Sequence, residues 1–199
     1  MGWEVEKKSN ALKDICQLDQ CQCRNHIKGA YREFMPQLNS DEMKYIANEG
    51  IISRSLLESK LKTMKMTQPQ LKILREICDT CVFHNVGVSV RIESVNVSQL
   101  TVTQSEANVN TINEIASRLH PKSLKPTNMS HYLQTQIHVM TQKDPIIVSR
   151  DNKVIDGHHR FHAIKRTKPD ASVCVIRLDV PHYHAMVISW AFSKNAHKF

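Results

Sequence analysis

The chain has 199 residues and a formal net charge of +8, and hydrophobic residues make up 41% of it, which is enough to build a buried core in one or two domains. No run of roughly eighteen apolar residues occurs, and residues 1–8 are charged and lack an apolar segment, so the sequence predicts neither a membrane span nor a secretory signal. The 6 cysteines are unevenly spaced, which is typical of reduced thiols and not of a disulfide framework, so we expect a cytoplasmic or similarly reducing compartment.

Residues 1–84 have the pattern of a helical region. Apolar residues at helical spacing predict helices over residues 9–28, 40–49 and 53–64, and a further helix from Pro69 onward. Gly50 is well placed to end the second of these helices, because glycine adopts the left-handed conformation that closes many helices. The region contains no convincing strand alternation, so we expect a small helical bundle or cap.

Four cysteines of this helical region form a candidate metal site. Cys21, Cys23, Cys78 and Cys81 would together supply four thiolates to a structural zinc ion. However, C-x-C is not the usual spacing of a zinc knuckle, and the second pair lies on the apolar side of a predicted helix, where small buried thiols are common. We therefore favour buried thiols over zinc.

A domain boundary is predicted at residues 84–85, where helical spacing gives way to alternation. Val88, Val90 and Ile92 alternate with polar residues, which predicts a half-buried strand. Residues 85–199 carry most of the excess charge, +6 against +2 for residues 1–84. A basic surface favours nucleotides, nucleic acid or another acidic partner.

The remaining elements alternate between strand and helix. Helical spacing predicts helices over residues 110–119, from Ser130 onward and from Pro181 onward, and β-branched runs predict strands over residues 146–148 and 173–178. The predicted fold class is therefore α+β, with a helical N-terminal region at residues 1–84 followed by a small mixed-sheet domain at residues 85–199.

One stretch carries the strongest functional signal. Residues 156–160 have the sequence Asp-Gly-His-His-Arg; they follow a predicted hairpin over residues 145–155 and open a predicted helix. The first amides of a helix have no internal partner and carry the positive end of its dipole, so an anion such as phosphate is their natural ligand. Gly157 suits this turn, because a side chain would obstruct either a positive φ or a closely approaching ligand.

The neighbouring side chains fit the same chemistry. Arg160 offers a planar fork of donors for phosphate oxygens, and His158 and His159 would donate to phosphate when protonated. Asp156 is placed to hold a metal ion or to accept a proton. The competing interpretation is an ordinary helix start, with an aspartate cap followed by solvated histidines.

Residues 155–163, Ile-Asp-Gly-His-His-Arg-Phe-His-Ala, resemble the G-x-x-R-x-x-A phosphate motif of the ParB/sulfiredoxin superfamily. The D-G-H-H-R string is similar to that of ParB-like domains and free-serine kinases, and the resemblance extends over about residues 88–180. It implies a small nucleotide-binding fold, whose known members include CTP-hydrolysing partitioning proteins, ATP-dependent sulfinic-acid reductases, nucleases and an amino-acid kinase. His158 stands where sulfiredoxins have a reactive cysteine, which argues against reductase chemistry, and the chain after Arg160 is too short for the helix-turn-helix domain of partitioning proteins.

The resemblance also implies roles for a loop that follows the first strand. In ParB-like domains and serine-kinase relatives such a loop faces the nucleotide, and here it contains Gln104 and Glu106. Glu106 is thus a candidate catalytic carboxylate and Gln104 a candidate phosphate or substrate ligand, although a solvated loop glutamate is an equal alternative. Asp156 and His159 complete the candidate catalytic set, and residues 157–160 form the candidate phosphate-binding set.

Together these features predict a protein that binds ATP or CTP with Mg²⁺, held through Asp156, and hydrolyses or transfers the terminal phosphate, acting on or near DNA. Two alternatives stay open. One is a non-catalytic module that holds nucleic-acid phosphate or an acidic partner, with the N-terminal helices docking into a homo-oligomer or larger assembly. The other is a ParB-like DNase.

Overall fold

The structure, a computed structural model, describes residues 36–63, 87–104, 107–121 and 127–194. Within these ranges the strands are β1 (Ile51–Ile52), β2 (Val88–Asn96), β3 (Thr101–Val102), β4 (Ile146–Ser149), β5 (Lys153–Asp156) and β6 (Ser172–Leu178). The helices are α2 (Ser40–Glu49), α3 (Arg54–Thr63), α5 (Val109–Leu119), α6 (Met129–Lys143), α7 (His158–Thr167) and α8 (His182–Ala191), with a 3-10 turn η3 (Val97–Gln99). The predicted α+β fold class is confirmed.

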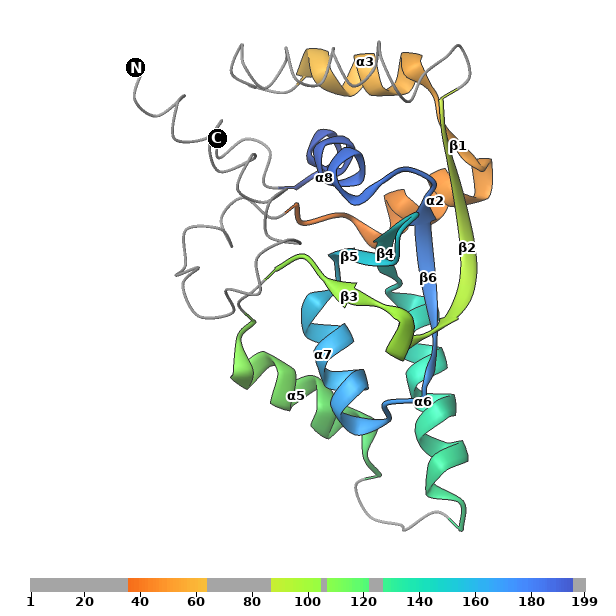
Figure 1. The fold of residues 1–199 in the computed structure, drawn as a ribbon, viewed down its shortest axis with the longest axis vertical. Helices are drawn as coiled ribbons and strands as arrows, with labels where there is room; N and C mark the ends of the chain where they lie inside the picture. Colours follow the sequence, from red (N-terminus) through yellow and green to blue (C-terminus); the bar gives the residue numbers. More distant parts are fainter. Residues whose placement is uncertain (1–35, 64–86, 105–106, 122–126, 195–199) are drawn as a thin grey trace.

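The strands form one mixed sheet in the order β1-β2-β6-β4-β5-β3 (Figure 1). Antiparallel pairing joins β1 to β2, β2 to β6 and β4 to β5, whereas β6 with β4 and β5 with β3 are parallel. The predicted hairpin is confirmed: β4 and β5 pair through Val148 and Val154, and Asn152 adopts a positive φ of 61° in the connecting turn. Asparagine tolerates this conformation better than most residues.

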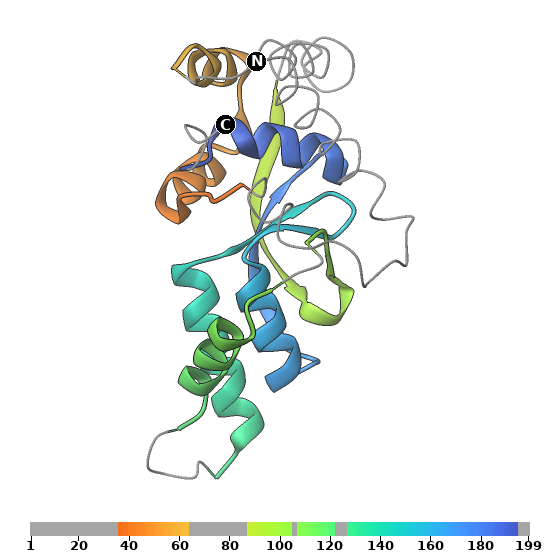
Figure 2. The ribbon, with the colours of Figure 1, turned by 90° about the vertical axis from the view of Figure 1, so that its left-hand side faces the viewer.

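Helices cover both faces of the sheet (Figures 1 and 2). On one face, α2 and α8 pack over a core that includes Ile147, Ile155 and Ile176. On the other, α5, α6 and α7 pack over a second core that includes Ile146 and Val148. Alternate residues of a strand point to opposite faces, so β4 contributes to both cores and is buried along its whole length.

Part of the predicted helical N-terminal region, strand β1, belongs to this sheet. Residues Ile51 and Ile52 pair with β2, so the expectation that residues 1–84 contain no strand is wrong. A two-residue strand is too short to show alternation in sequence. The predicted boundary at residues 84–85 falls in a stretch outside the described residues, and segments from either side of it share the sheet and the core.

Several predicted helix ends can be compared with the observed ones. Gly50 ends α2 with φ 76°, as predicted, and its amide donates to carbonyls of the last helical turn. The helix predicted to start at Ser130 begins at Met129, because Asn128 is the capping residue and its side chain accepts from the amide of His131. None of the helices in the described ranges is long and apolar enough to cross a membrane.

Candidate anion-binding site

The turn between β5 and α7 is built around Gly157. Its φ of 93° and ψ of 23° lie in the left-handed region, as the sequence predicted, and it occupies the N-cap position of α7 without a side-chain cap. A Cβ added there would lie 3.0 Å from Nη2 of Arg160 and 3.4 Å from Cα of Ile146. The backbone conformation therefore requires glycine, and a larger residue would also displace the guanidinium that packs against it.

Asp156, the last residue of β5, connects this turn to the segment before α2 through hydrogen bonds. Its Oδ1 accepts from the amide of Gly157 at 2.7 Å, and its Oδ2 accepts from the amide of Leu38 at 3.0 Å. Burial raises the pKa of this carboxyl above its ordinary value, even though the two amides and the nearby Arg160 favour the charged form. Because Asp156 bonds the amide of the N-cap residue and none within the helix, it is not the helix cap of the competing interpretation.

His158 does not fit its predicted role as a protonated phosphate donor. Its side chain is buried, and burial together with the neighbouring His162 and His159 lowers its pKa to about 3, so the ring is neutral at physiological pH. Its Nε2 lies 3.2 Å from Oγ1 of Thr103 and 3.3 Å from the amide nitrogen of Gln104. The ring therefore ties α7 to the loop after β3, and only the backbone of His158 remains suited to an anion.

His159 and Arg160 are half-buried beside the turn. Nε2 of His159 accepts from the amide of Asn108 at 3.1 Å, which links α7 to the cap of α5. Arg160 forms an ion pair with Asp144 through Nη1 and donates from Nη2 to the carbonyl of Pro145 at 3.1 Å. Its Nε is buried and has no hydrogen-bond partner among the described residues, which leaves one donor of the guanidinium unused.

These groups line a cavity of about 250 Å³ in front of the α7 N-terminus. Its walls come from the segment before α2, the loop after β3, α5 and the β5–α7 turn, through Pro36, Gln37, Gln104, Thr111, Ile115 and residues 156–160. The structure thus brings together every predicted site residue except Glu106, which lies outside the described residues, as do the four cysteines weighed for zinc.

Sequence reasoning missed several contributors to this site. Asp144 binds Arg160, but it lies 16 residues earlier, outside the motif, and nothing in its local pattern marks it. Pro36 and Gln37 reach the cavity because Leu38 pairs with Ser193 near the end of α8, a long-range bridge that no local pattern predicts.

The donor set fits a magnesium ion only in combination with phosphate oxygens. Among the described residues, no group of three or more histidine, cysteine, aspartate or glutamate side chains is arranged to hold a metal ion. Asp156 is the single carboxylate that lines the cavity in the part of the chain that the structure describes, and Mg²⁺ in phosphate sites is commonly held by one or two carboxylates together with the phosphates themselves.

The sequence matches no protein-family model, and neither a curated protein nor a solved structure is significantly similar to it.

Proposed function

We propose that this protein binds a nucleoside triphosphate, ATP or CTP, by its terminal phosphates at the β5–α7 turn and hydrolyses or transfers the last of them. The observation that carries the proposal is the turn itself. A left-handed Gly157 at the start of α7 leaves the first helical amides without a side-chain cap and facing a cavity that Arg160 also lines. Backbone amides, a helix dipole and a guanidinium together are the usual chemistry of phosphate binding.

The guanidinium of Arg160 has hydrogen-bond donors available for a phosphate. Its buried Nε is unused among the described residues, and its ion pair with Asp144 can be exchanged because the Asp144 side chain is 42% exposed and can be solvated by water. A phosphate with nearly two negative charges competes well against one carboxylate. The ion pair therefore holds the guanidinium in position without blocking the site.

The size of the cavity bounds what it recognises. A volume of about 250 Å³ accommodates phosphate groups but lies below the range of about 300–1,000 Å³ that encloses a whole drug-sized ligand. The base and sugar would then lie largely outside it. We expect affinity to depend on the phosphates and to discriminate weakly between bases.

The other residues have supporting roles in this proposal. Asp156 would hold a magnesium ion, which supplies charge neutralisation for the phosphates when bound. Gln104 would contact the phosphates or the substrate, and His159 would donate or accept a proton at the phosphates. Glu106 would activate the acceptor, water or a hydroxyl; that role rests on the family resemblance alone.

The decisive experiment is phosphate release from ATP and CTP with Mg²⁺, with Arg160→Ala as the test variant. Removing a charge-assisted contact worth about 1.5–3 kcal/mol should weaken triphosphate binding roughly ten- to hundredfold. Arg118→Ala is the matched control, because Arg118 pairs with Glu114 on the exposed side of α5 and does not line the cavity. Loss of activity in both variants, or in neither, would contradict the proposal.

A non-catalytic binding module is the second candidate. It is favoured by the neutral, buried ring of His158, because that ring cannot deliver a proton at the cavity near neutral pH. Triphosphate or DNA binding that depends on Arg160 but shows no turnover would support this module. Plasmid nicking that is lost in Asp156→Ala would instead support a DNase.

A further inference from the structure

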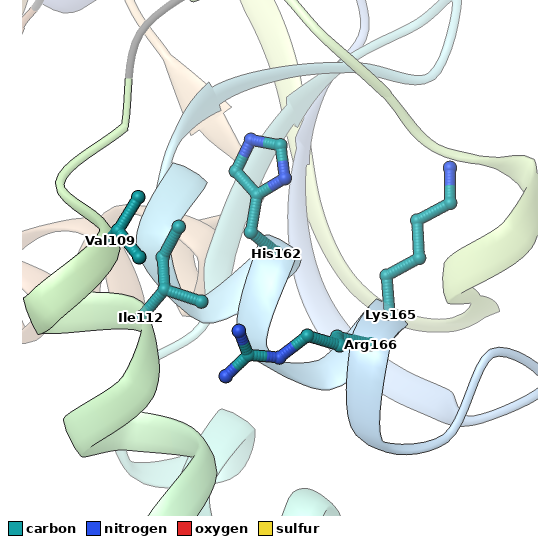
Figure 3. A pocket seen from close by; sticks show the side chains of 5 residues that line it. All are labelled: Val109, Ile112, His162, Lys165 and Arg166. Carbon is teal, nitrogen blue, oxygen red and sulfur yellow. The ribbon is translucent and has the colours of Figure 1, made fainter.

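A second cavity of about 320 Å³ lies between α5 and α7. Two residues of α5, Val109 and Ile112, form one side of it, and three residues of α7, His162, Lys165 and Arg166, form the other (Figure 3). None of these five residues lines the cavity at the β5–α7 turn. The second cavity is therefore a separate place for a ligand.

No described acidic side chain pairs with the two cations of this cavity. Neither Lys165 nor Arg166 forms a salt bridge within the parts of the chain that the structure describes, and the Lys165 ammonium lies instead 5.2 Å from the ring centroid of Phe161. Most other arginines of the described ranges do have acidic partners, namely Arg91, Arg118, Arg150, Arg160 and Arg177. Two neighbouring permanent cations beside a cavity favour a ligand that carries about two negative charges.

The opposite wall is apolar and open to solvent. Val109 is 62% exposed although it is a large aliphatic residue, and Ile112 lies beside it one helical turn further along α5. Figure 3 shows the Arg166 side chain extending from α7 toward α5, below Ile112, whereas the Lys165 side chain points away from Val109 and Ile112. A ligand in this space would meet hydrocarbon on one side and cationic donors on the other.

We propose that the α5–α7 cavity binds a phosphate monoester carried on a small apolar or planar group. A phosphate monoester carries about 1.5–2 negative charges at neutral pH, which matches the two cations, and the guanidinium fork of Arg166 suits its oxygens. The flexible Lys165 side chain can swing toward the same group. The apolar part of the ligand would cover Val109 and Ile112.

This ligand is distinct from the proposed triphosphate. An α-helix rises about 1.5 Å per residue, so Lys165 lies roughly 10 Å along α7 from the amide of His158. The two positions are thus about two helical turns apart, and the two cavities share no lining residue. The inference therefore goes beyond the proposed function, and it holds whether or not the first cavity binds a nucleotide.

The test is calorimetric titration of the full chain with phenyl phosphate, with inorganic phosphate and benzoate as comparison probes. Phenyl phosphate should bind at least several-fold more tightly than either, because inorganic phosphate lacks the apolar part and benzoate carries one charge. Lys165→Ala/Arg166→Ala should weaken phenyl phosphate at least tenfold. Both positions are exposed, so the double variant should keep the wild-type thermal transition.

Two matched variants separate the outcomes. Arg118→Ala removes an exposed cation of α5 and should leave phenyl phosphate binding unchanged. Arg160→Ala tests the first cavity, which also offers donors to a phosphate: phenyl phosphate binding that depends on Arg160 and not on Lys165 and Arg166 would place the ligand in the first cavity and overturn the inference. Equal binding of inorganic phosphate or benzoate, or preferential binding of a short oligonucleotide, would also overturn it.

Discussion

Replacing Gly157 with alanine perturbs both the backbone and the guanidinium that packs against it. At φ 93° an alanine costs about 1–2 kcal/mol of folding free energy, because its Cβ crowds the following carbonyl. Its Cβ would also stand 3.0 Å from Nη2 and 3.4 Å from Nε of Arg160, so the guanidinium must shift by a few tenths of an ångström. A long side chain can move that far at little cost in stability, but the movement displaces the phosphate donors.

Gly50 provides the matched control for this substitution. It also has a positive φ, 76°, but a Cβ added there meets nothing within 4 Å. Gly157→Ala and Gly50→Ala should therefore lower the melting temperature by similar amounts, roughly 2–8 °C for a chain of this size. Only Gly157→Ala should weaken triphosphate binding.

The two properties are measured separately, by thermal denaturation followed by circular dichroism and by calorimetric titration with ATP. Equal loss of ATP affinity in both variants would show that general destabilisation explains the effect. Unchanged affinity in both would show that the turn does not bind phosphate. Either result would refute the reasoning about Gly157 and Arg160.

Three further predictions concern individual side chains. The pKa of His158 is lowered from 6.5 to about 3, so its contribution to stability is complete above pH 6.5 and falls as the pH drops toward 3. The free energy of unfolding, measured with urea at pH 7 and at pH 5, should fall in the wild type by up to about 1.4 kcal/mol per pH unit more than in His158→Gln. Equal falls in the two proteins would contradict this prediction. Arg177→Ala should cost about 1–3 kcal/mol in urea unfolding, because it leaves the carbonyls of Ser149 and Arg150 without their donor, whereas Glu93 keeps its ion pair with Arg91; a loss below about 0.5 kcal/mol would contradict this structural role. Asp144→Asn should tighten triphosphate binding several-fold in calorimetry by releasing the charge of Arg160, and weaker binding would show that Asp144 chiefly positions the guanidinium.

The strand–turn–helix at the site could be predicted because each part has a local signal. An apolar run over residues 146–148, a second run ending at Ile155, and a lone glycine followed by helical spacing specify a hairpin and a helix start. The positive φ of Gly157 follows from the same pattern, since only glycine adopts it readily. Local rules were sufficient here because the hairpin and the helix start are each specified by residues close in sequence.

The burial of His158 could also have been inferred. His158, Phe161 and Ile164 are spaced three apart, so they share one face of α7, and all three are buried. His159 lies about 100° further around the helix and stays half-buried. The sequence pattern therefore distinguished the two histidines, although their chemistry suggested the same role for both.

Long-range contacts could not be predicted in this way. The pairing of Arg160 with Asp144, of β1 with β2, and of Leu38 with Ser193 joins segments whose own patterns carry no information about one another. Two of these contacts shape the cavity directly, because they set the position of the guanidinium and place Pro36 and Gln37 in its wall.

The most direct test of the phosphate site is an amide ¹H–¹⁵N titration of the 22.9 kDa chain with inorganic tripolyphosphate and Mg²⁺. The amides of His158, His159 and residue 160 should shift most, because the Gly157 amide already donates to Asp156, and Arg160→Ala should weaken this response roughly ten- to hundredfold. If those three amides stay unmoved at concentrations that shift amides elsewhere on the surface, the turn does not hold phosphate and the proposed function is wrong.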